Sequence, residues 1–381
     1  MNFSMKVEQV ELMKALNSLR SSIGKGKLSP YEKYLKLEIK TEPGNRHLLI
    51  LHTSCDGDYK QLRFHVLDGT DGVSPLIEFS KLYGIVSTID PISEITMTQE
   101  DTMIRFDYTG RHDPIMFNGV DSEMFPQSPD LSKGETLELE YSVLLSALEF
   151  CAPYLTTDSP NPILNCMDVT IEPTLIKFSA VDNANKRFVY GECPTSSTTP
   201  GRFTVEVSAL KKMIAGLSPN MKVEINISET HVTFSQSHLQ ISLRRIVGDF
   251  PDITKLMLKT CPVNLVMNKQ DLLSALERVK VFVDEKDYKA RIINVKFDNM
   301  LTNISLKSQL GQLEEMIVTQ SNSTALEMSF LVDSFYQSIK SIDSVDVALD
   351  FYSKNNVLLK PNTPSTRYSE QRVLVQAIQL D

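Results

Sequence analysis

The chain has 381 residues, a formal net charge of -9 and 41% hydrophobic residues, which indicates two or three ordinary globular domains. The negative charge argues against a surface that binds nucleic acid over its whole area, although it allows one local basic face. The sequence contains no run of 18 apolar residues and begins with MNFSMKVEQVELMKAL, which lacks the basic start and apolar centre of a signal peptide. We therefore expect an intracellular protein without membrane contact.

Cysteine and histidine spacing predicts neither disulfides nor a metal site. The five cysteines contain no CxxC pair, and the six histidines form no HxxxH or HExxH pair. We expect buried thiols and no metal.

The first predicted elements are an alternating strand and an amphipathic helix, FSMKVEQVELMKAL, followed by the glycine-rich basic loop IGKGK at 23–27. The loop lacks the GxxxxGK[ST] spacing of a P-loop. A second helix is predicted from Pro75 in PLIEFSKLYGIVSTI, and two alternating strands follow in EITMTQEDTMIRFDY. On helical wheels the apolar residues of each helix form one face, and they are Leu12, Met13, Leu16 and Leu19, then Leu76, Phe79, Leu82 and Val86.

The same order of elements returns twice further along the chain. LLSAL occurs at 144–148 and at 272–276, so the copies start 128 residues apart (272 minus 144). Each copy follows an alternating strand, GETLELEYSV or CPVNLVMNKQD, and precedes a second helix, VSALKKMIAGLS or FLVDSFYQSIKSI. Alternating strands joined by short polar turns come after each second helix.

This repetition predicts an α+β fold of three tandem domains, each with two helices packed on antiparallel sheets. Turn-forming and charged residues collect at 125–135 (FPQSPDLSKGE) and 250–262 (FPDITKLMLKTCP), which we interpret as linkers. The expected domains are therefore 1–133, 134–260 and 261–381.

Four of the six predicted helices carry a cation opposite their apolar face, at Lys14, Lys81, Lys212 and Arg278. A solvated helix face commonly carries Lys or Arg, so each cation alone indicates only exposure. In an acidic protein, cations at equivalent helical positions favour a directed surface that meets phosphates. Two helices lack this feature, because SVLLSALEF offers Ser146 and Glu149 there and FYQSIKSI places Lys340 on the flank.

The three-part repeat, the FPD at 250–252 and the run VDNANKRFV at 181–189 resemble the bacterial DNA polymerase III beta sliding clamp family. The resemblance extends over nearly the full length in the family's order. It implies a ring of two chains joined head to tail, with helices on the inner wall around double-stranded DNA of any sequence. It also implies a processivity factor in the cytoplasm, at the nucleoid of a bacterial or phage-infected cell, without catalytic residues or cofactors.

The resemblance implies specific DNA-contacting residues. The family's basic loop residue aligns with Gly26, so the flanking Lys25 and Lys27 would substitute for it. The family's basic pair in the second domain aligns with Ser208 and Ala209, and Lys211 and Lys212 are the replacements. The complete expected set is Lys14, Lys25, Lys27, Lys81, Lys211, Lys212 and Arg278.

The family also implies a pocket for short peptides of the replicative DNA polymerase, the clamp loader and other proteins with a clamp-binding motif. An apolar groove suits leucine or aromatic anchors, and the matching residues are Leu164, Arg187, Phe188, Pro251, Leu256, Gln376 and Ile378. The ending here, Ile378-Gln379-Leu380-Asp381, departs from the family's Met-Arg-Leu. Leu164 and Phe188 are equally compatible with core positions. The dimer contact would join Ile115 and Phe117 to Val281 and Phe282.

Two other classes of function remain open from the residues alone. In an enzyme, the adjacent acids Asp284-Glu285 or Glu314-Glu315 would be catalytic, but neither a Ser/His/Asp order nor a metal spacing accompanies them. An intracellular tandem-domain scaffold that does not encircle DNA would explain the repeat and the acidity. It gives no reason for cations at equivalent helical positions.

Overall fold

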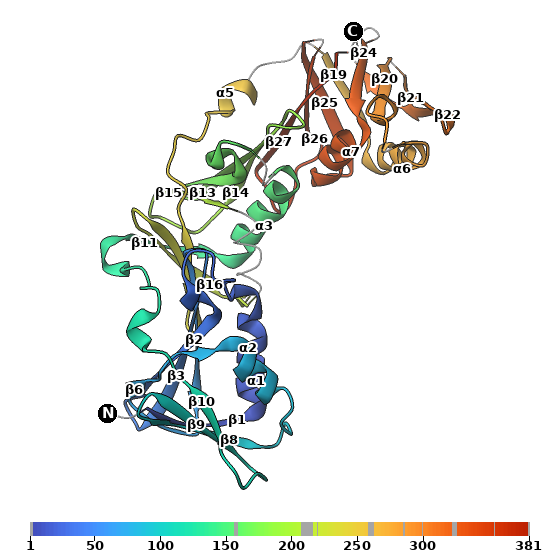
Figure 1. Cartoon of the computed structure of the whole chain (residues 1–381). Coiled ribbons are helices and arrows are strands. Elements are labelled where there is room, and N and C mark those ends of the chain that lie inside the picture. Colours follow the sequence, from blue (N-terminus) through green and yellow to red (C-terminus); the bar gives the residue numbers. More distant parts are fainter. Residues whose placement is uncertain are drawn as a thin grey trace. The chain divides into compact units, whose positions relative to one another are not determined.

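The computed structural model describes residues 3–155, 159–206, 216–218, 220–257, 263–284, 286–298, 300–321, 326–353 and 355–379. The chain forms two compact units (Figure 1). Unit 1 contains Met1–Tyr141 and Ser208–Arg245, and unit 2 contains Ser142–Val207 and Ile246–Asp381. Among the helices described, none has the length and apolar character needed to cross a membrane.

The first sheet of unit 1 has five antiparallel strands in the order β10-β9-β8-β1-β5. Its strands are β1 (Ser4–Glu8), β5 (Asp68–Thr70), β8 (Glu94–Glu100), β9 (Met103–Tyr108) and β10 (Ile115–Asn118). β10 lies at the edge, so one side of its backbone is not paired within this sheet.

The second sheet of unit 1 joins strands from the start and the middle of the chain. Its order is β11-β16-β17-β18-β4-β3-β2-β6, with β7 also paired to β2. The strands are β2 (Tyr34–Glu42), β3 (Arg46–Cys55), β4 (Asp58–Val66), β6 (Gly72–Val73), β7 (Ile77–Glu78), β11 (Glu135–Glu140), β16 (Lys222–Ile227), β17 (His231–Gln236) and β18 (Leu239–Arg244). The junction is the antiparallel pair of β4 and β18, in which Leu62 lies opposite Leu239.

Two helices pack together in unit 1, α1 (Gln9–Leu19) and α2 (Phe79–Val86). Most of the predicted apolar faces are confirmed, because Leu12, Leu16 and Leu19 of α1 are 0% exposed and belong to the same core as Phe79, Leu82 and Val86 of α2, and Met13 is partly buried against it. Leu76 is also buried, but α2 begins only at Phe79, so Leu76 lies outside the helix. Apolar residues three and four positions apart bury one stripe of each helix and leave the opposite stripe in solvent.

The larger sheet of unit 2 has nine strands in the order β15-β12-β13-β14-β27-β26-β25-β19-β23. The strands are β12 (Cys166–Glu172), β13 (Leu175–Asp182), β14 (Arg187–Pro194), β15 (Gly201–Glu206), β19 (Val263–Asn268), β23 (Gln320–Ser321), β25 (Asp346–Ser353), β26 (Asn356–Pro361) and β27 (Glu370–Gln376). Within unit 2, the pair β14–β27 joins segments of the second and third predicted domains.

The smaller sheet of unit 2 has the order β22-β21-β20-β24. Its strands are β20 (Ile292–Phe297), β21 (Leu301–Ser308), β22 (Gly311–Val318) and β24 (Leu326–Leu331). The helices of unit 2 are α3 (Tyr141–Cys151), α5 (Thr254–Met257), α6 (Lys269–Lys280) and α7 (Val332–Ser341).

The two LLSAL copies lie in α3 and α6, which confirms that the repeat marks equivalent helices. Leu144 and Leu148 are buried in α3, and Leu272 and Leu276 are buried in α6. The side chain of Asn268 caps α6 by accepting hydrogen bonds from the N–H groups of residues 270 and 271, which satisfies two amides that lack partners at a helix start.

The predicted helix in VSALKKMIAGLS falls largely outside the described residues, and so do Lys211 and Lys212. The buried thiols are confirmed at Cys151, Cys166 and Cys193, whereas Cys55 is half-buried.

Strand pairing divides the predicted central domain between the two units. Within 134–260, the strands β11, β16, β17 and β18 continue into β4 in unit 1, whereas β12, β13, β14 and β15 continue into β27 in unit 2. Continuous sheets therefore define larger compact units than the sequence repeat does.

Candidate functional site

An apolar cluster lies on one face of the large sheet in unit 2, and we call this candidate site the groove. Val181, Phe188, Leu374 and Leu358 lie opposite one another on the adjacent strands β13, β14, β27 and β26, so their side chains share one face. Residues from the short helix η6 (Pro162–Asn165) and from the segment around α5 pack against this row, and they are Ile163, Phe250, Ile253 and Met257.

Two of the predicted pocket residues pack against this cluster. Leu164 and Phe188 are partly buried and pack against the cluster. Leu256 lies on α5, next to the buried Met257, with 45% of its surface exposed. Pro251 is exposed in the segment that leads to α5, next to the buried Phe250. Partial exposure of apolar side chains on a rigid sheet is what a peptide anchor requires.

The two predicted residues near the C-terminus lie at different places. Gln376 is exposed at the end of β27, opposite Asn356. Ile378 pairs instead with Ser329, where its N–H donates a 2.8 Å hydrogen bond to the carbonyl oxygen. Ile378 lines a separate cavity of about 1040 Å³ together with Tyr288 and other residues of the small sheet.

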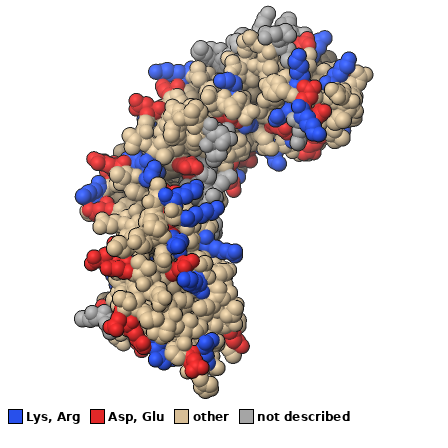
Figure 2. Space-filling view, in the orientation of Figure 1, with Lys and Arg blue, Asp and Glu red and all other residues tan. Residues whose placement is uncertain are grey.

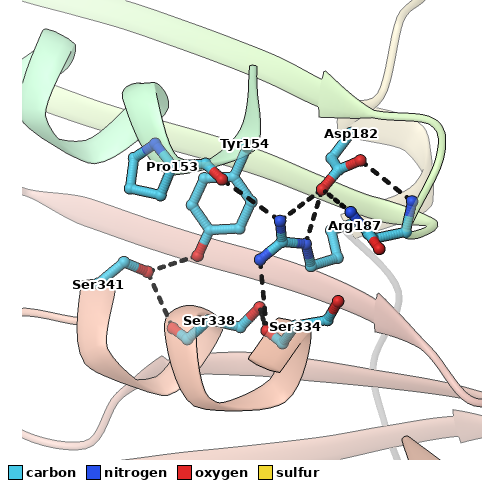
Figure 3. Close-up of polar contacts among 8 residues, drawn as sticks. Pro153, Tyr154, Asp182, Arg187, Ser334, Ser338 and Ser341 are labelled. Carbon is cyan, nitrogen blue, oxygen red and sulfur yellow. Dashed lines mark hydrogen bonds and ion pairs between the residues drawn. The ribbon is translucent and has the colours of Figure 1, made fainter. Parts of the chain in front are cut away.

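Arg187 lies on the opposite face of the same sheet from the groove. It is 5% exposed and forms a buried ion pair with Asp182 of β13. Its guanidinium also donates to the carbonyl oxygens of Ser334 and Pro153, each at 3.3 Å, and it lies 4.8 Å from the ring centroid of Tyr154 (Figure 3). Sequence reasoning missed Asp182 and Tyr154, because a strand sequence alone does not say which face is covered by helices.

The predicted helical cations are exposed, and each one that the structure describes is paired with a carboxylate. Lys14 contacts Glu11 at 2.7 Å, one turn earlier on α1, and Lys81 contacts Glu78 at 3.2 Å, the residue directly before α2. On the face shown in Figure 2, acidic and basic side chains are interspersed. The local potential at these helices is therefore weaker than the lysines alone would produce.

Arg278 of α6 forms the best-aligned of these pairs. Its Nε and one terminal nitrogen each donate a 2.7 Å hydrogen bond to a different oxygen of Glu315 on β22. The Arg278 hydrogen bond lowers the pKa of Glu315, so this carboxylate stays ionised near neutrality. Glu315 was one of the acids considered for catalysis. Both of its carboxylate oxygens accept hydrogen bonds from Arg278.

Lys25 and Lys27 differ from the helical cations. Both are exposed in the loop between η1 (Arg20–Ser22) and η2 (Pro30–Lys33), and no ion pair holds either of them among the residues that the structure describes. The N–H of Gly24 donates to the carbonyl oxygens of Glu32 and Ser54, which anchors the start of the loop. Gly26 has a φ of +76°, a conformation that glycine adopts without strain.

The predicted dimer residues lie at two places, one sheet edge and the end of a helix. Ile115 and Phe117 are on β10, where Phe117 is 6% exposed and its ring meets Phe106 at a centroid distance of 5.7 Å. Val281 directly follows α6 and is 74% exposed, whereas Phe282 is half-buried.

A second edge strand carries exposed apolar residues that the sequence analysis did not single out. β22 is the edge of the small sheet, and its Met316 and Val318 are 71% and 73% exposed. The available signal was the segment EEMIVT, in which apolar residues occupy successive positions, so both faces of the strand carry them.

Across the described residues, no three His, Cys, Asp or Glu side chains gather in an arrangement that could bind a metal ion. Asp284 accepts a hydrogen bond from the N–H of Lys286 in a turn. Neither observation offers an arrangement suited to hydrolysis.

No protein-family model matches the chain. The beta sliding clamp of Synechococcus elongatus is 23% identical over 291 residues, which cover 74% of this chain and 76% of that protein. The beta sliding clamp of Bacillus subtilis is 21% identical over 242 residues, 61% of this chain and 62% of that protein.

Solved structures match over the complete chain. A DNA polymerase III subunit beta from Pseudomonas aeruginosa superposes with a TM-score of 0.86 at 15% identity, covering 100% of both chains. The resemblance to the beta sliding clamps is confirmed. A DNA polymerase III beta chain from Streptococcus pneumoniae superposes with a TM-score of 0.85 at 18% identity, again over 100% of both chains. The chain therefore has the sliding-clamp fold from end to end, although few of its residues are those of the solved clamps.

Proposed function

We propose that this chain is a DNA sliding clamp, a non-catalytic processivity factor that encircles duplex DNA and tethers a replicative polymerase to it. The observation that carries the proposal is the full-length match to solved DNA polymerase III beta subunits. The exposed cations on α1, α2 and α6 are the second support, because equivalent helices would line the opening of a ring.

The ring that we propose contains two chains, each with the domains 1–133, 134–260 and 261–381. Its contacts with DNA would come from Lys14, Lys25, Lys27, Lys81, Lys211, Lys212 and Arg278. Contacts to phosphates carry no sequence information, so such a ring holds DNA of any sequence. The chains would join head to tail through the β10 edge, with Ile115 and Phe117, and the β22 edge, with Val281 and Phe282 nearby.

The apolar groove around Phe188 is the proposed site for partner peptides from the polymerase, the clamp loader and other clamp-binding proteins. Leu164, Pro251, Leu256 and Gln376 would surround a peptide there. Ile378 would contribute only if the C-terminal segment leaves Ser329. The proposed location is the cytoplasm, at the nucleoid.

A topological assay tests the function directly. The protein is loaded onto nicked circular DNA, separated from free protein by gel filtration and followed after the circle is linearised. We expect retention on the circle and loss from the linear form at the same salt concentration. Equal loss from both forms would show ordinary electrostatic binding and would refute encirclement.

A further inference from the structure

The guanidinium nitrogens of Arg187 all donate hydrogen bonds to other groups inside the protein. Its Nε and one terminal nitrogen donate to Asp182, and its terminal nitrogens donate to the carbonyl oxygens of Ser334 and Pro153. The side chain is 6% exposed and that of Asp182 is 1% exposed. Asp182 also accepts hydrogen bonds from the N–H and the side-chain amide of Asn185, so the buried pair is satisfied on both sides.

The direction of Arg187 follows from the register of the sheet. Arg187 lies opposite Asp182 and Val375, whereas its neighbour Phe188 lies opposite Val181 and Leu374. Successive side chains of a strand point to opposite faces. Phe188 therefore faces the groove, and Arg187 faces the layer that contains α7.

A ladder of hydroxyl groups extends this contact along α7. The Ser338 hydroxyl donates to the carbonyl oxygen of Ser334, and the Ser341 hydroxyl donates to that of Ser338. Ser341 also shares a 2.5 Å hydrogen bond with the hydroxyl of Tyr154, whose ring packs against Arg187. Figure 3 shows these groups between the strand and the helix. One arginine thus joins β14, β13, η5 (Ala152–Tyr154) and α7.

We propose that Arg187 and Asp182 are positioning residues for the peptide groove: they hold β14 against α7, which fixes Phe188 on the opposite face of the sheet, and they do not touch the bound peptide. The inference rests on the peptide-binding role proposed above. It differs from the role that the family resemblance implies for Arg187, namely a direct pocket contact. For Arg187 to reach a peptide in the groove, its guanidinium would have to leave Asp182 as an unpaired buried carboxylate and cross to the other face of the sheet.

The test compares Arg187→Lys, Asp182→Asn and their double variant with Phe188→Ala as the groove-face control. The probe is a fluorescein-labelled eight-residue peptide with one Leu and one Phe anchor and Ala or Ser elsewhere, titrated by fluorescence anisotropy. Hydrogen exchange of β14 and α7 is measured by mass spectrometry without peptide. All measurements are made well below the unfolding temperature of each variant.

We expect Arg187→Lys and Asp182→Asn each to weaken peptide binding about tenfold. The double variant should lose no more than either single variant, because both substitutions break one contact. Exchange in β14 and α7 should rise in all three. Phe188→Ala should weaken binding while exchange in α7 stays at the wild-type rate.

A different pattern would overturn the proposal. If Arg187→Lys weakens binding while Asp182→Asn does not, and exchange stays unchanged, Arg187 contacts the peptide directly. If the wild type does not bind the probe, the proposed peptide-binding function is refuted. The hydrogen-exchange rates of the variants then decide by themselves whether Arg187 holds β14 against α7.

Discussion

Arg278 and Glu315 form a two-point ion pair, with 2.7 Å between each donor nitrogen and its carboxylate oxygen. One of the cations proposed to meet DNA is thus already matched by an anion of its own chain. A phosphate that binds Arg278 must compete with Glu315, or must bind beside a carboxylate that repels it. Weakly held phosphates favour a ring that slides.

Glu315→Gln is expected to strengthen DNA binding and to make it more sensitive to salt. Freeing Arg278 for one further phosphate contact should increase the magnitude of the slope of log K against log salt by about 0.9. Anisotropy titrations with a short duplex between 50 and 200 mM salt measure this slope. Glu314→Gln removes the same charge from the neighbouring position and is the matched control. Equal slopes for the two variants would show that the ion pair has no influence on DNA binding.

The loop lysines have no competing carboxylate among the described residues, so their loss should act directly on DNA. Changing Lys25, Lys27 and Lys212 together to Glu is expected to reduce loading on circular DNA about tenfold or more at 0.1 M salt. Dimerisation should be unaffected, as measured by the mass in solution. Lys133→Glu with Lys255→Glu places new charges on the two predicted linkers and should load normally. Undiminished loading of the triple variant would exclude these lysines as phosphate contacts.

The edge strand β22 is expected to form part of the contact between chains. Met316→Asp places a charge where an apolar side chain is 71% exposed, and in a buried interface that charge would lack a partner. We expect the mass in solution to fall from about twice 42.9 kDa to that of one chain. Val345, which is 70% exposed elsewhere in unit 2, provides the control Val345→Asp. If Met316→Asp and Val345→Asp form dimers with equal dissociation constants, β22 is not part of the interface.

Glu38 is expected to make the stability of the protein depend on pH in the acid range. The hydrogen bond from His52 is the main cause that lowers the pKa of Glu38 from 4.5 to about 2. Because the folded state favours the carboxylate, the stabilisation is complete above pH 4.5 and disappears as the pH falls towards 2. Glu38→Gln should therefore lower the unfolding temperature at pH 7, and the difference from the wild type should shrink below pH 4.5.

Calorimetry between pH 3 and 8 follows this difference. Glu123→Gln, at an exposed carboxyl that lines one cavity together with Glu38 and His52, is the control and should change the unfolding temperature little at any pH. A difference between Glu38→Gln and the wild type that stays constant down to pH 3 would contradict the assignment.

Helical periodicity predicted which residues of the helices are buried and which are exposed. Leu12, Leu16, Leu272 and Leu276 are buried as expected, because a 3.6-residue period places them on one stripe that only a neighbouring layer can cover. Exposure of Lys14, Lys81 and Arg278 follows from the same period. Their carboxylate partners could be foreseen only for Glu11 and Glu78, which lie three residues earlier in the chain, whereas Glu315 comes from a distant strand.

Periodicity could not predict which face of a sheet is covered by helices, or which distant strands pair with one another. A period of two assigns Arg187 and Phe188 to opposite faces but does not say which face a helix covers. The pairing of β4 with β18 and of β14 with β27 joins segments far apart in the chain, and no local pattern encodes it. The domain scheme derived from the repeat therefore does not describe how the sheets join.

The pairing of Leu62 with Leu239 has a consequence for any shortened form of the chain. A fragment ending near residue 133 would lack β18, and β4 would then present its unpaired backbone groups to other strands. Because strands of successive repeats share one sheet, the repeats cannot be separated without exposing a sheet edge.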